Sequence, residues 1–398
     1  MNDRRVLIVT EYFYPRNRPD SYFLTEISKA IYKAANGNVK VICNSDLEGK
    51  EELQFVKDKI TRLSGYKLNA RNLLQRFIMF TQSTMKLGWH TLLSINNGDR
   101  VFSVTNPAFL ILILGVIKWF KNFEYTLLVY DVFPENMISA NIVKEDSIFY
   151  VVLKKLFDWS YRQADHLIVI GRDMQELIGS KTHNAIPMSL ITNWCDIEKV
   201  VPQPKTENQI IKNHGLDDKV VFSFVGNFGR VQGIEMLLEV ASLVRNVKFR
   251  LLFIGDGALL PSINNYINEN PNGNVIYAGS FPASEQNSFL NACDVAIISL
   301  SRSMYGLGVP SKSYYNMAAN KPLFYLGDEK SEIGRVIIEN NIGWVLNNMT
   351  ANMVAEKIDS IIDDDIYLQS YGDKARRVVE KCYSKDIILH KYIKLFTQ

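Results

Sequence analysis

The sequence predicts an α/β protein made of two doubly wound domains, and three observations lead to this expectation. The chain has 398 residues, which exceeds one ordinary hydrophobic core and suits two domains. Short apolar runs alternate with helical periods, as they do in parallel sheets covered by helices. This series stops at a polar, proline-containing stretch and then starts again. The hydrophobic content of 47% and charged content of 22% are typical of globular proteins.

The first series opens with an apolar run at residues 5–10, an amphipathic helix over residues 21–34 and a second apolar run at residues 38–43. This order predicts a βαβ unit and therefore a parallel sheet. Further strands are expected at residues 59–63, 100–104, 126–130, 166–170 and 189–192, with helical patterns between most of them.

Residues 196–218 are expected to connect the two domains, because prolines, Asn208 and a pair of aspartates replace the apolar runs there. The predicted organisation is a first domain at 1–195, the connector at 196–218, a second domain at 219–375 and a C-terminal helical segment at 376–398. The second series predicts strands at 220–226, 249–255, 275–279, 295–300 and 322–326, and helices at 233–245, 258–270, 284–292, 311–319, 330–340 and 384–396.

Composition argues against several classes of protein. A net charge of +3 is too small to indicate nucleic-acid binding. Four widely spaced cysteines without a CxxC pair predict neither a disulfide framework nor a zinc ribbon, and the five histidines show no metal-binding spacing. We therefore expect no metal and no other cofactor. The first residues are charged and lead directly into a strand, so we expect no signal peptide and a cytoplasmic location.

Positive charge is concentrated in one part of the first domain. Residues 61–125 contain eight basic and two acidic residues, and residues 67–92 combine this charge with Leu, Ile and Phe. This pattern resembles an interfacial helix and predicts contact with an anionic membrane surface. A core helix with basic flanks is the alternative interpretation.

The stretch at residues 306–312 (GLGVPSK) follows a predicted strand and precedes a predicted helix. Pro310 suits the first helical turn, where its missing N–H costs nothing. The glycines allow close approach of the backbone to a ligand, and Lys312 adds positive charge beside the N–H groups of the helix start. This combination predicts a phosphate site. A solvated surface lysine is the other interpretation of Lys312.

A second glycine-rich stretch, residues 226–233 (GNFGRVQG), lies at another strand-to-helix junction. Loop N–H groups and the Arg230 guanidinium would suit a diphosphate. A tight turn whose glycines serve packing alone is the alternative. Residues 255–257 (GDG) end the next strand, where a plain turn is the simpler interpretation.

In the first domain, Asp131 follows a strong strand, where cleft residues are expected. It could orient a substrate hydroxyl, assist proton transfer or cap the next helix. Arg16 and Arg18 follow the first strand and could bind a phosphate or be ordinary surface residues. Residues 193–196 suit a hinge better than catalysis.

Several stretches together resemble one family, the family 4 retaining glycosyltransferases of GT-B fold. Their order and spacing match along nearly the whole chain. The similarity is greatest to the branch of colanic-acid and O-antigen enzymes that transfer sugars such as N-acetylfucosamine. The matching stretches are EYFYP, SYFLTEISKAI, VYDVFPE, YRQADHLIVIGRDMQELI, LITNWCDIEKV, FVGNFGRVQG, IGDG, YAGSFPASE and GVPSKSYYNMAANKP.

The resemblance implies two Rossmann-like domains facing a cleft, with a C-terminal helix that can cross back to the first domain. The second domain would bind a nucleotide sugar, with UDP-sugar as the expected donor, and the first would bind a lipid-linked saccharide. Hexosyl or N-acetylhexosaminyl transfer with retention would build a surface polysaccharide at the inner face of the membrane. The implied catalytic residues are Asp131, Arg230 and Lys312; the donor residues are Gly226, Asn227, Gly229, Arg230, Gln232, Gly255, Leu307, Gly308, Val309 and Lys312; the acceptor residues are Arg16, Arg18, Asp131 and Glu135.

The chain departs from the family pattern at the donor helix. Two glutamates eight positions apart are usual there, whereas this sequence has Leu307 and Tyr315. This leaves open a non-catalytic GT-B subunit that binds a partner enzyme. A nucleotide-sugar epimerase with the same two-domain plan is a second alternative. An epimerase would need an acid and a base on opposite sides of the cleft, and the sequence offers no such pair.

Overall fold

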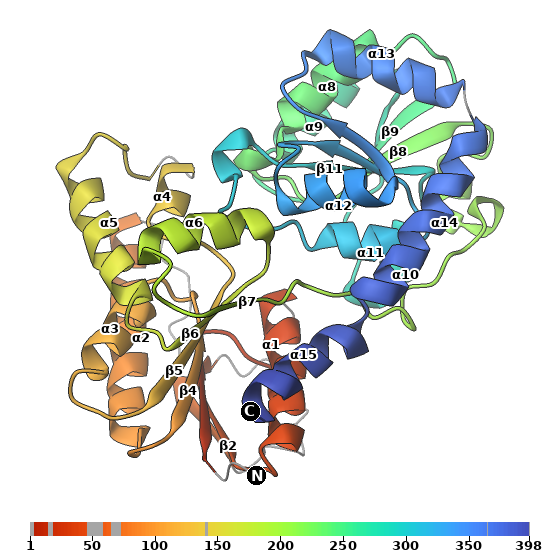
Figure 1. Cartoon of the computed structure of the whole chain (residues 1–398). Coiled ribbons are helices and arrows are strands. Elements are labelled where there is room, and N and C mark those ends of the chain that lie inside the picture. The colour runs from red at the N-terminus through yellow and green to blue at the C-terminus, as the bar shows by residue number, and fades with distance from the viewer. Residues whose placement is uncertain are drawn as a thin grey trace. The chain divides into compact units, whose positions relative to one another are not determined.

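The computed structural model describes residues 4–14, 19–45, 59–64, 73–139, 142–363 and 365–397 (Figure 1). The chain divides into two compact units. The first contains residues 1–192, 306–308 and 388–398, and the second contains residues 193–305 and 309–387. Among the described residues, no helix has the length and apolar character needed to cross a membrane.

The first unit is built on a seven-stranded parallel sheet with the order β3-β2-β1-β4-β5-β6-β7. Continuous apolar runs form its central strands, as expected where both faces of a sheet are covered. The order reverses between β1 and β4, so ligands are expected beyond the carboxyl ends of these strands. The strands are β1 (Val6–Thr10), β2 (Val39–Ser45), β3 (Ile60–Ser64), β4 (Arg100–Val104), β5 (Glu124–Val129), β6 (His166–Val169) and β7 (Met188–Leu190).

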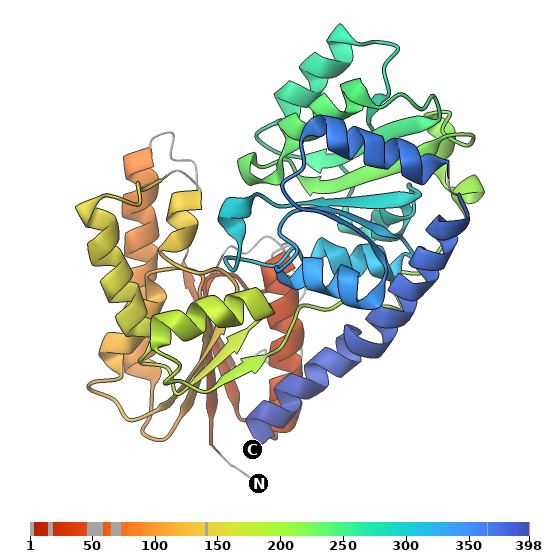
Figure 2. The same ribbon diagram turned by 45° about the horizontal axis from the view of Figure 1, so that its top comes forward.

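Helices cover both faces of this sheet. Figures 1 and 2 show α2, α3 and α5 side by side on one face and α1 on the other. The helices of the unit are α1 (Pro19–Ala34), α2 (Leu73–Ser94), α3 (Leu110–Ile117), α4 (Glu135–Ser139), α5 (Ile148–Tyr161) and α6 (Arg172–Thr182). Ser147 begins α5 by accepting a hydrogen bond from the Tyr150 N–H, which satisfies one of the free donors of the first turn.

The last helix, α15 (Lys385–Thr397), ends against the first sheet. Phe396 packs edge-on against Phe102 of β4 at 5.4 Å between ring centroids. The Arg100 guanidinium donates to the Phe396 carbonyl oxygen over 3.0 Å. Residues 388–398 accordingly group with the first unit, as expected for a C-terminal helix that crosses back.

The second unit has a six-stranded parallel sheet with the order β10-β9-β8-β11-β12-β13, which reverses between β8 and β11. Figure 1 shows α8, α9 and α13 on one face and α11, α12 and α14 on the other. Its strands are β8 (Val220–Asn227), β9 (Phe249–Asp256), β10 (Val275–Tyr277), β11 (Val295–Ser299), β12 (Leu323–Leu326) and β13 (Gly343–Leu346). Its α-helices are α7 (Gln209–Asn213), α8 (Ile234–Leu243), α9 (Leu260–Glu269), α10 (Gln286–Leu290), α11 (Lys312–Ala318), α12 (Glu332–Asn340), α13 (Ala351–Ile362) and α14 (Asp365–Cys382).

The α/β class and the two doubly wound sheets confirm the sequence-based prediction. Three local features differ from it. The segment expected as a connector contains α7, because Ile210 and Ile211 are buried in the core of the second unit. Strand β13, helix α13 and residues 365–375 of α14 were not predicted. Helix α11 begins at Lys312, so Pro310 precedes the helix instead of occupying its first turn.

Candidate functional site in the two units

Lys312 and Gly226 meet at the point where the strand order of the second sheet reverses. Gly226 lies near the end of β8, and Lys312 begins α11, which follows the neighbouring strand β11. A Cβ on Gly226 would coincide with the Lys312 ammonium nitrogen, because the lysine side chain lies directly against the glycine backbone. Gly226 also has a φ of +143°, a conformation that L side chains rarely adopt. Both constraints require glycine at this position.

Lys312 lacks a counter-ion within the described part of the chain. Burial lowers the pKa of the Lys312 ammonium from 10.5 to about 8. Desolvation disfavours the charged form, and a nearby anion would oppose this effect. A partly buried lysine of this kind at a sheet switch point is suited to bind an anionic ligand.

The backbone beside Gly226 is also closely packed. Gly255 of β9 pairs with Gly226 in register, and a Cβ on Gly255 would overlap the Gly226 carbonyl. The Gly255 φ of +138° again favours glycine. The absence of a side chain at Gly255 therefore allows the ends of β8 and β9 to pack closely. This packing within the sheet is enough to explain a glycine at this position. Its predicted contact with the donor stays a prediction.

The loop after β8 carries the other predicted cation. Residues 230–232 form a 3₁₀ turn that places Arg230 on the surface. Within the described residues its guanidinium makes no hydrogen bond or ion pair. The turn is joined to the end of β11 by a hydrogen bond from the Ser301 N–H to the Val231 oxygen over 2.9 Å. Exposed Asn227 ends β8, and partly buried Gln232 ends the turn. The Gly229 carbonyl accepts a hydrogen bond from the Gln232 N–H over 3.1 Å.

In the first unit, Asp131 directly follows β5 and is held by neighbouring groups. Its N–H and that of Tyr130 both donate to the Thr105 hydroxyl over 3.1 Å. Its carboxylate accepts from the Asn136 side-chain amide over 3.0 Å. These contacts fix the position of the carboxylate, and its role in proton transfer stays a prediction.

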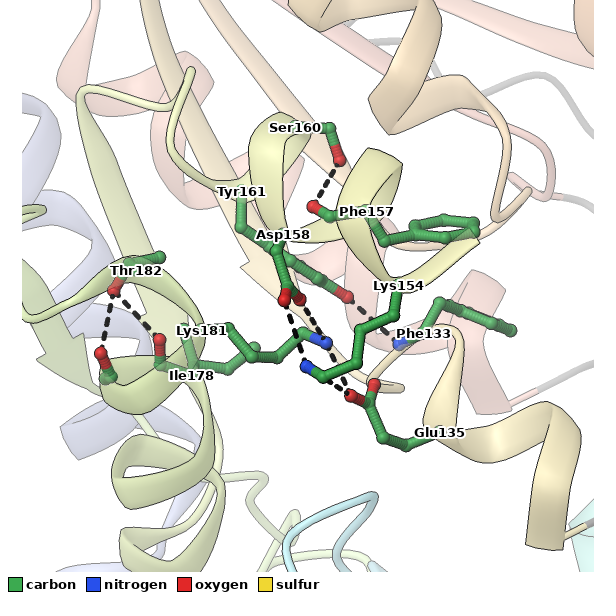
Figure 3. A network of polar contacts seen from close by, with 11 residues as sticks. Phe133, Glu135, Lys154, Phe157, Asp158, Ser160, Tyr161, Ile178, Lys181 and Thr182 are labelled. Carbon is green, nitrogen blue, oxygen red and sulfur yellow. Dashed lines mark hydrogen bonds and ion pairs between the residues drawn. The ribbon is translucent and has the colours of Figure 1, made fainter. Parts of the chain in front are cut away.

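Glu135, the first residue of α4, belongs to a network of charged side chains (Figure 3). Its carboxylate lies 2.6 Å from the ammonium of Lys181 at the end of α6. Lys181 is also 2.5 Å from Asp158 of α5, and Lys154 lies between the same two carboxylates at 3.4 and 2.9 Å. The Lys181 side chain is 1% exposed. Glu135 is thus bound to two lysines, and acceptor binding by this residue stays a prediction.

The same network supports the backbone next to Asp131. The Tyr161 hydroxyl accepts a hydrogen bond from the Phe133 N–H over 3.1 Å, and Lys181 lies 5.7 Å above the Tyr161 ring. Burial lowers the pKa of Lys181. The nearby Glu135 carboxylate acts in the opposite direction but does not outweigh the effect of burial. The sequence contained a signal for Lys154 and Asp158, which are four residues apart on one helix, but none for Lys181.

The remaining predicted residues are distributed as follows. Leu307 and Gly308 group with the first unit, where the Leu307 carbonyl accepts from the Val132 N–H over 3.4 Å. Val309 packs against a core cluster of the second unit. Arg16 and Arg18 lie outside the described residues. The described residues contain no group of three or more His, Cys, Asp or Glu side chains arranged to hold a metal ion.

Comparison with known proteins assigns the family. The family model for glycosyl transferases group 1 matches residues 206–378. A probable glycosyltransferase of Pseudomonas aeruginosa, WbjE, is 36% identical over 98% of this chain and 96% of its own length. The chain belongs to the group 1 glycosyltransferases.

Two further comparisons place this glycosyltransferase among its relatives. A poly(ribitol-phosphate) alpha-N-acetylglucosaminyltransferase of Staphylococcus aureus is 24% identical over 52% of this chain and 41% of its own length. The Anabaena protein HepE, solved in complex with UDP, superposes with a TM-score of 0.69 at 13% identity, covering 99% of each chain. This structural similarity confirms the GT-B fold.

Proposed function

We propose that this glycosyltransferase moves a sugar from a UDP-sugar to a lipid-linked saccharide, with retention, during synthesis of a surface polysaccharide. The observation that carries the proposal is the Lys312 ammonium, which lies against Gly226 at the switch point of the second sheet without a counter-ion in the described chain. The UDP complex of HepE supports a uridine nucleotide. The relative named as a poly(ribitol-phosphate) alpha-N-acetylglucosaminyltransferase supports a polymeric product and an N-acetylhexosaminyl donor.

The proposed chemistry needs positive charge more than a strong base. The bond between the anomeric carbon and the diphosphate oxygen breaks while an acceptor oxygen bonds to the same face of that carbon. The acceptor proton passes to the leaving diphosphate oxygen. Negative charge develops on the diphosphate, and fixed cations in a partly desolvated site stabilise such charge strongly. Lys312 would supply one of these cations and Arg230 the other.

Asp131 has a supporting role in this proposal. Its carboxylate is held by Asn136 and its backbone by Thr105, so it can orient an acceptor hydroxyl with little rearrangement. Arg16 and Arg18 remain our candidates for binding the phosphate of a lipid-linked acceptor. We place the reaction at the inner face of the cytoplasmic membrane, where a lipid-linked acceptor would be available.

Replacing Lys312 tests the donor part of the proposal. Loss of a hydrogen bond to a charged group costs about 1.5–3 kcal/mol, so Lys312→Ala should weaken UDP binding by about tenfold to a hundredfold. Isothermal titration calorimetry with UDP measures this change. Lys248→Ala is the matched control, because Lys248 is exposed in the same unit. Equal UDP affinity in Lys312→Ala and the wild type would refute the donor assignment.

The non-catalytic alternative makes a different prediction. Leu307 and Tyr315 replace the usual glutamates, so a subunit that binds nucleotide without turning it over is the specific competitor. Transfer assays with UDP-, GDP- and dTDP-sugars on a saccharide acceptor separate the two. Sugar transfer supports the enzyme. UDP binding without transfer or donor hydrolysis across the panel supports the subunit.

A further inference from the structure

Large apolar side chains are exposed on three neighbouring helices of the first unit. On α2 they follow a helical spacing of four residues at Met85, Trp89 and Leu93. Trp119 and Phe120, just after α3, are 66% and 76% exposed, and Ile148 at the start of α5 is 84% exposed. We call the whole set the outer apolar surface: Ile78, Met85, Trp89, Leu93, Val116, Trp119, Phe120, Ile148, Phe149, Val151, Val152 and Leu156.

The three helices form one continuous layer, as Figures 1 and 2 show. A Cβ on Gly88 of α2 would lie 2.6 Å from Ile113 of α3, so these helices approach closely. A Cβ on Gly115 of α3 would lie 3.1 Å from Trp159 of α5. The outer apolar surface is therefore a single region and not three separate sets of side chains.

Packing of the first unit does not account for these side chains. Beneath them, the core between the helices is already filled by aromatic rings: Phe109 lies 5.7 Å from Phe80 and 6.2 Å from Phe157. The exposed residues do not belong to this buried core. Contiguous exposed apolar surface of this kind marks an interaction site.

The charges around the surface indicate the kind of partner. In residues 78–94 of α2, in α3 and in the turn to residue 121, the basic residues are Lys86, Lys118 and Lys121, and no residue is acidic. On α5, Lys155 is exposed, and Asp158 is occupied by two lysines. Acidic groups do occur at the margins: Asp165 pairs with Lys118, and Glu145 and Asp146 precede α5.

We propose that the outer apolar surface inserts into an anionic lipid bilayer and that the basic side chains beside it bind the lipid headgroups. Apolar burial and attraction to anionic lipids together bind interfacial helices to membranes. Tryptophan is favoured at the membrane interface, and Trp89 and Trp119 are both on this surface. The inference deepens the proposed function, on which it rests for the lipid-linked acceptor.

This surface differs from the one expected from residues 67–92 alone. The side chains of residues 73–77 lie outside those described, and Phe80 is partly turned to the core against Phe109. The exposed apolar residues of α2 lie mostly further along the helix, and the larger contribution comes from the end of α3 and from α5. Apolar insertion, and not charge alone, should therefore dominate binding.

Cosedimentation of the 398-residue protein with phosphatidylcholine vesicles that contain about 30% of the anionic lipid phosphatidylglycerol tests the proposal. The double variant Trp119→Ser/Phe120→Ser should bind about tenfold or more weakly, because two large side chains no longer enter the bilayer. Ile148→Ser/Phe149→Ser should show the same loss from α5. The control is Val247→Ser, since Val247 is 83% exposed in the second unit and should not affect binding.

Insertion also predicts resistance to salt. Wild-type binding should largely persist at about 0.5 M NaCl, where exposed charges are strongly screened. Vesicles with brominated acyl chains should quench the tryptophan fluorescence of the wild type more than that of Trp89→Phe/Trp119→Phe. The inference would be overturned if the wild type did not bind vesicles. It would also be overturned if both serine double variants bound vesicles as tightly as the wild type.

Two more measurements distinguish membrane insertion from damage to the donor site and from self-association. UDP affinity should be unchanged in the serine double variants, so a failed vesicle test with intact UDP binding refutes the membrane surface and leaves the donor assignment standing. Light scattering reports self-association. If the wild type dimerises, the serine variants are monomeric and vesicle binding is unaffected, the surface is a contact between two copies and the proposal is wrong.

Discussion

Replacing Gly226 by alanine is the most direct test of how the proposed donor site is assembled. The new Cβ would occupy the place of the Lys312 ammonium, so the lysine must move away. The φ of +143° adds backbone strain of about 1–3 kcal/mol. Gly226→Ala should therefore lower the free energy of unfolding by this amount. It should also weaken UDP binding as much as Lys312→Ala does, by about tenfold to a hundredfold, because it displaces the same cation.

A double-mutant cycle separates the lysine from the strain. If Gly226→Ala acts on UDP through Lys312, it should change UDP affinity little when introduced into Lys312→Ala. Isothermal titration calorimetry of the four proteins gives this coupling, and urea denaturation gives their stability. The control for strain is Gly215→Ala, since Gly215 has a φ of +62° and no atom within 4 Å of its added Cβ. It should lose stability and keep UDP affinity. Additive effects of the two site substitutions on UDP binding would refute the reasoning.

Two other predictions concern buried charge. Because burial lowers the pKa of free Lys312 to about 8 and a bound diphosphate would raise it, UDP affinity should fall as pH rises above about 8, and the fall should be absent in Lys312→Ala. The same depressed pKa means that the unfolded state binds more protons between about pH 8 and 10.5, so this group should make the fold more stable as pH rises through that window. Lys181→Met should lower the free energy of unfolding in urea by about 3 kcal/mol, because it removes the buried lysine and leaves two partly buried carboxylates with Lys154 alone. The exposed Lys155→Met should change it by less than about 0.5 kcal/mol. Equal stability of these two variants would contradict a role for the network.

The architecture was largely predictable because its central strands are continuous apolar runs. Residues 220–226 and 249–255 are followed by glycines and helical periods, so their alternation specifies parallel sheets without any tertiary information. Strand β13 was missed because it is short and only partly buried, and thus lacks such a run. Helix α13 did carry signals, including Thr350, which accepts from the Met353 N–H, and buried Val354 and Ile358 four residues apart.

The candidate site was predictable in part. Gly226 and Lys312 could each be singled out because both follow strands, but their direct contact joins residues far apart in the chain and depends on β8 lying next to β11. Spacing in the sequence does not contain this neighbour relation. The environment of Glu135 was less predictable still. Its partner Lys181 lies in the last turn of a different helix. A lysine there interacts favourably with the helix dipole even when it faces solvent, so its position does not indicate an ion pair.

The packing around Gly226 gives a physical reason why two glycines and one lysine should act together. Gly255 has no side chain, which lets the Gly226 carbonyl approach β9; Gly226 has none, which lets the Lys312 side chain lie over the strand end. The lysine thereby enters a partly desolvated position, and that position lowers its pKa and leaves its charge poorly solvated. If the proposed site binds a diphosphate, the diphosphate would replace solvation that the ammonium has already lost on folding. The burial of Lys312 would then be a cost of folding that increases the gain on binding an anion. For this reason we expect that removing either the lysine or the glycine beside it affects the same step, the binding of UDP.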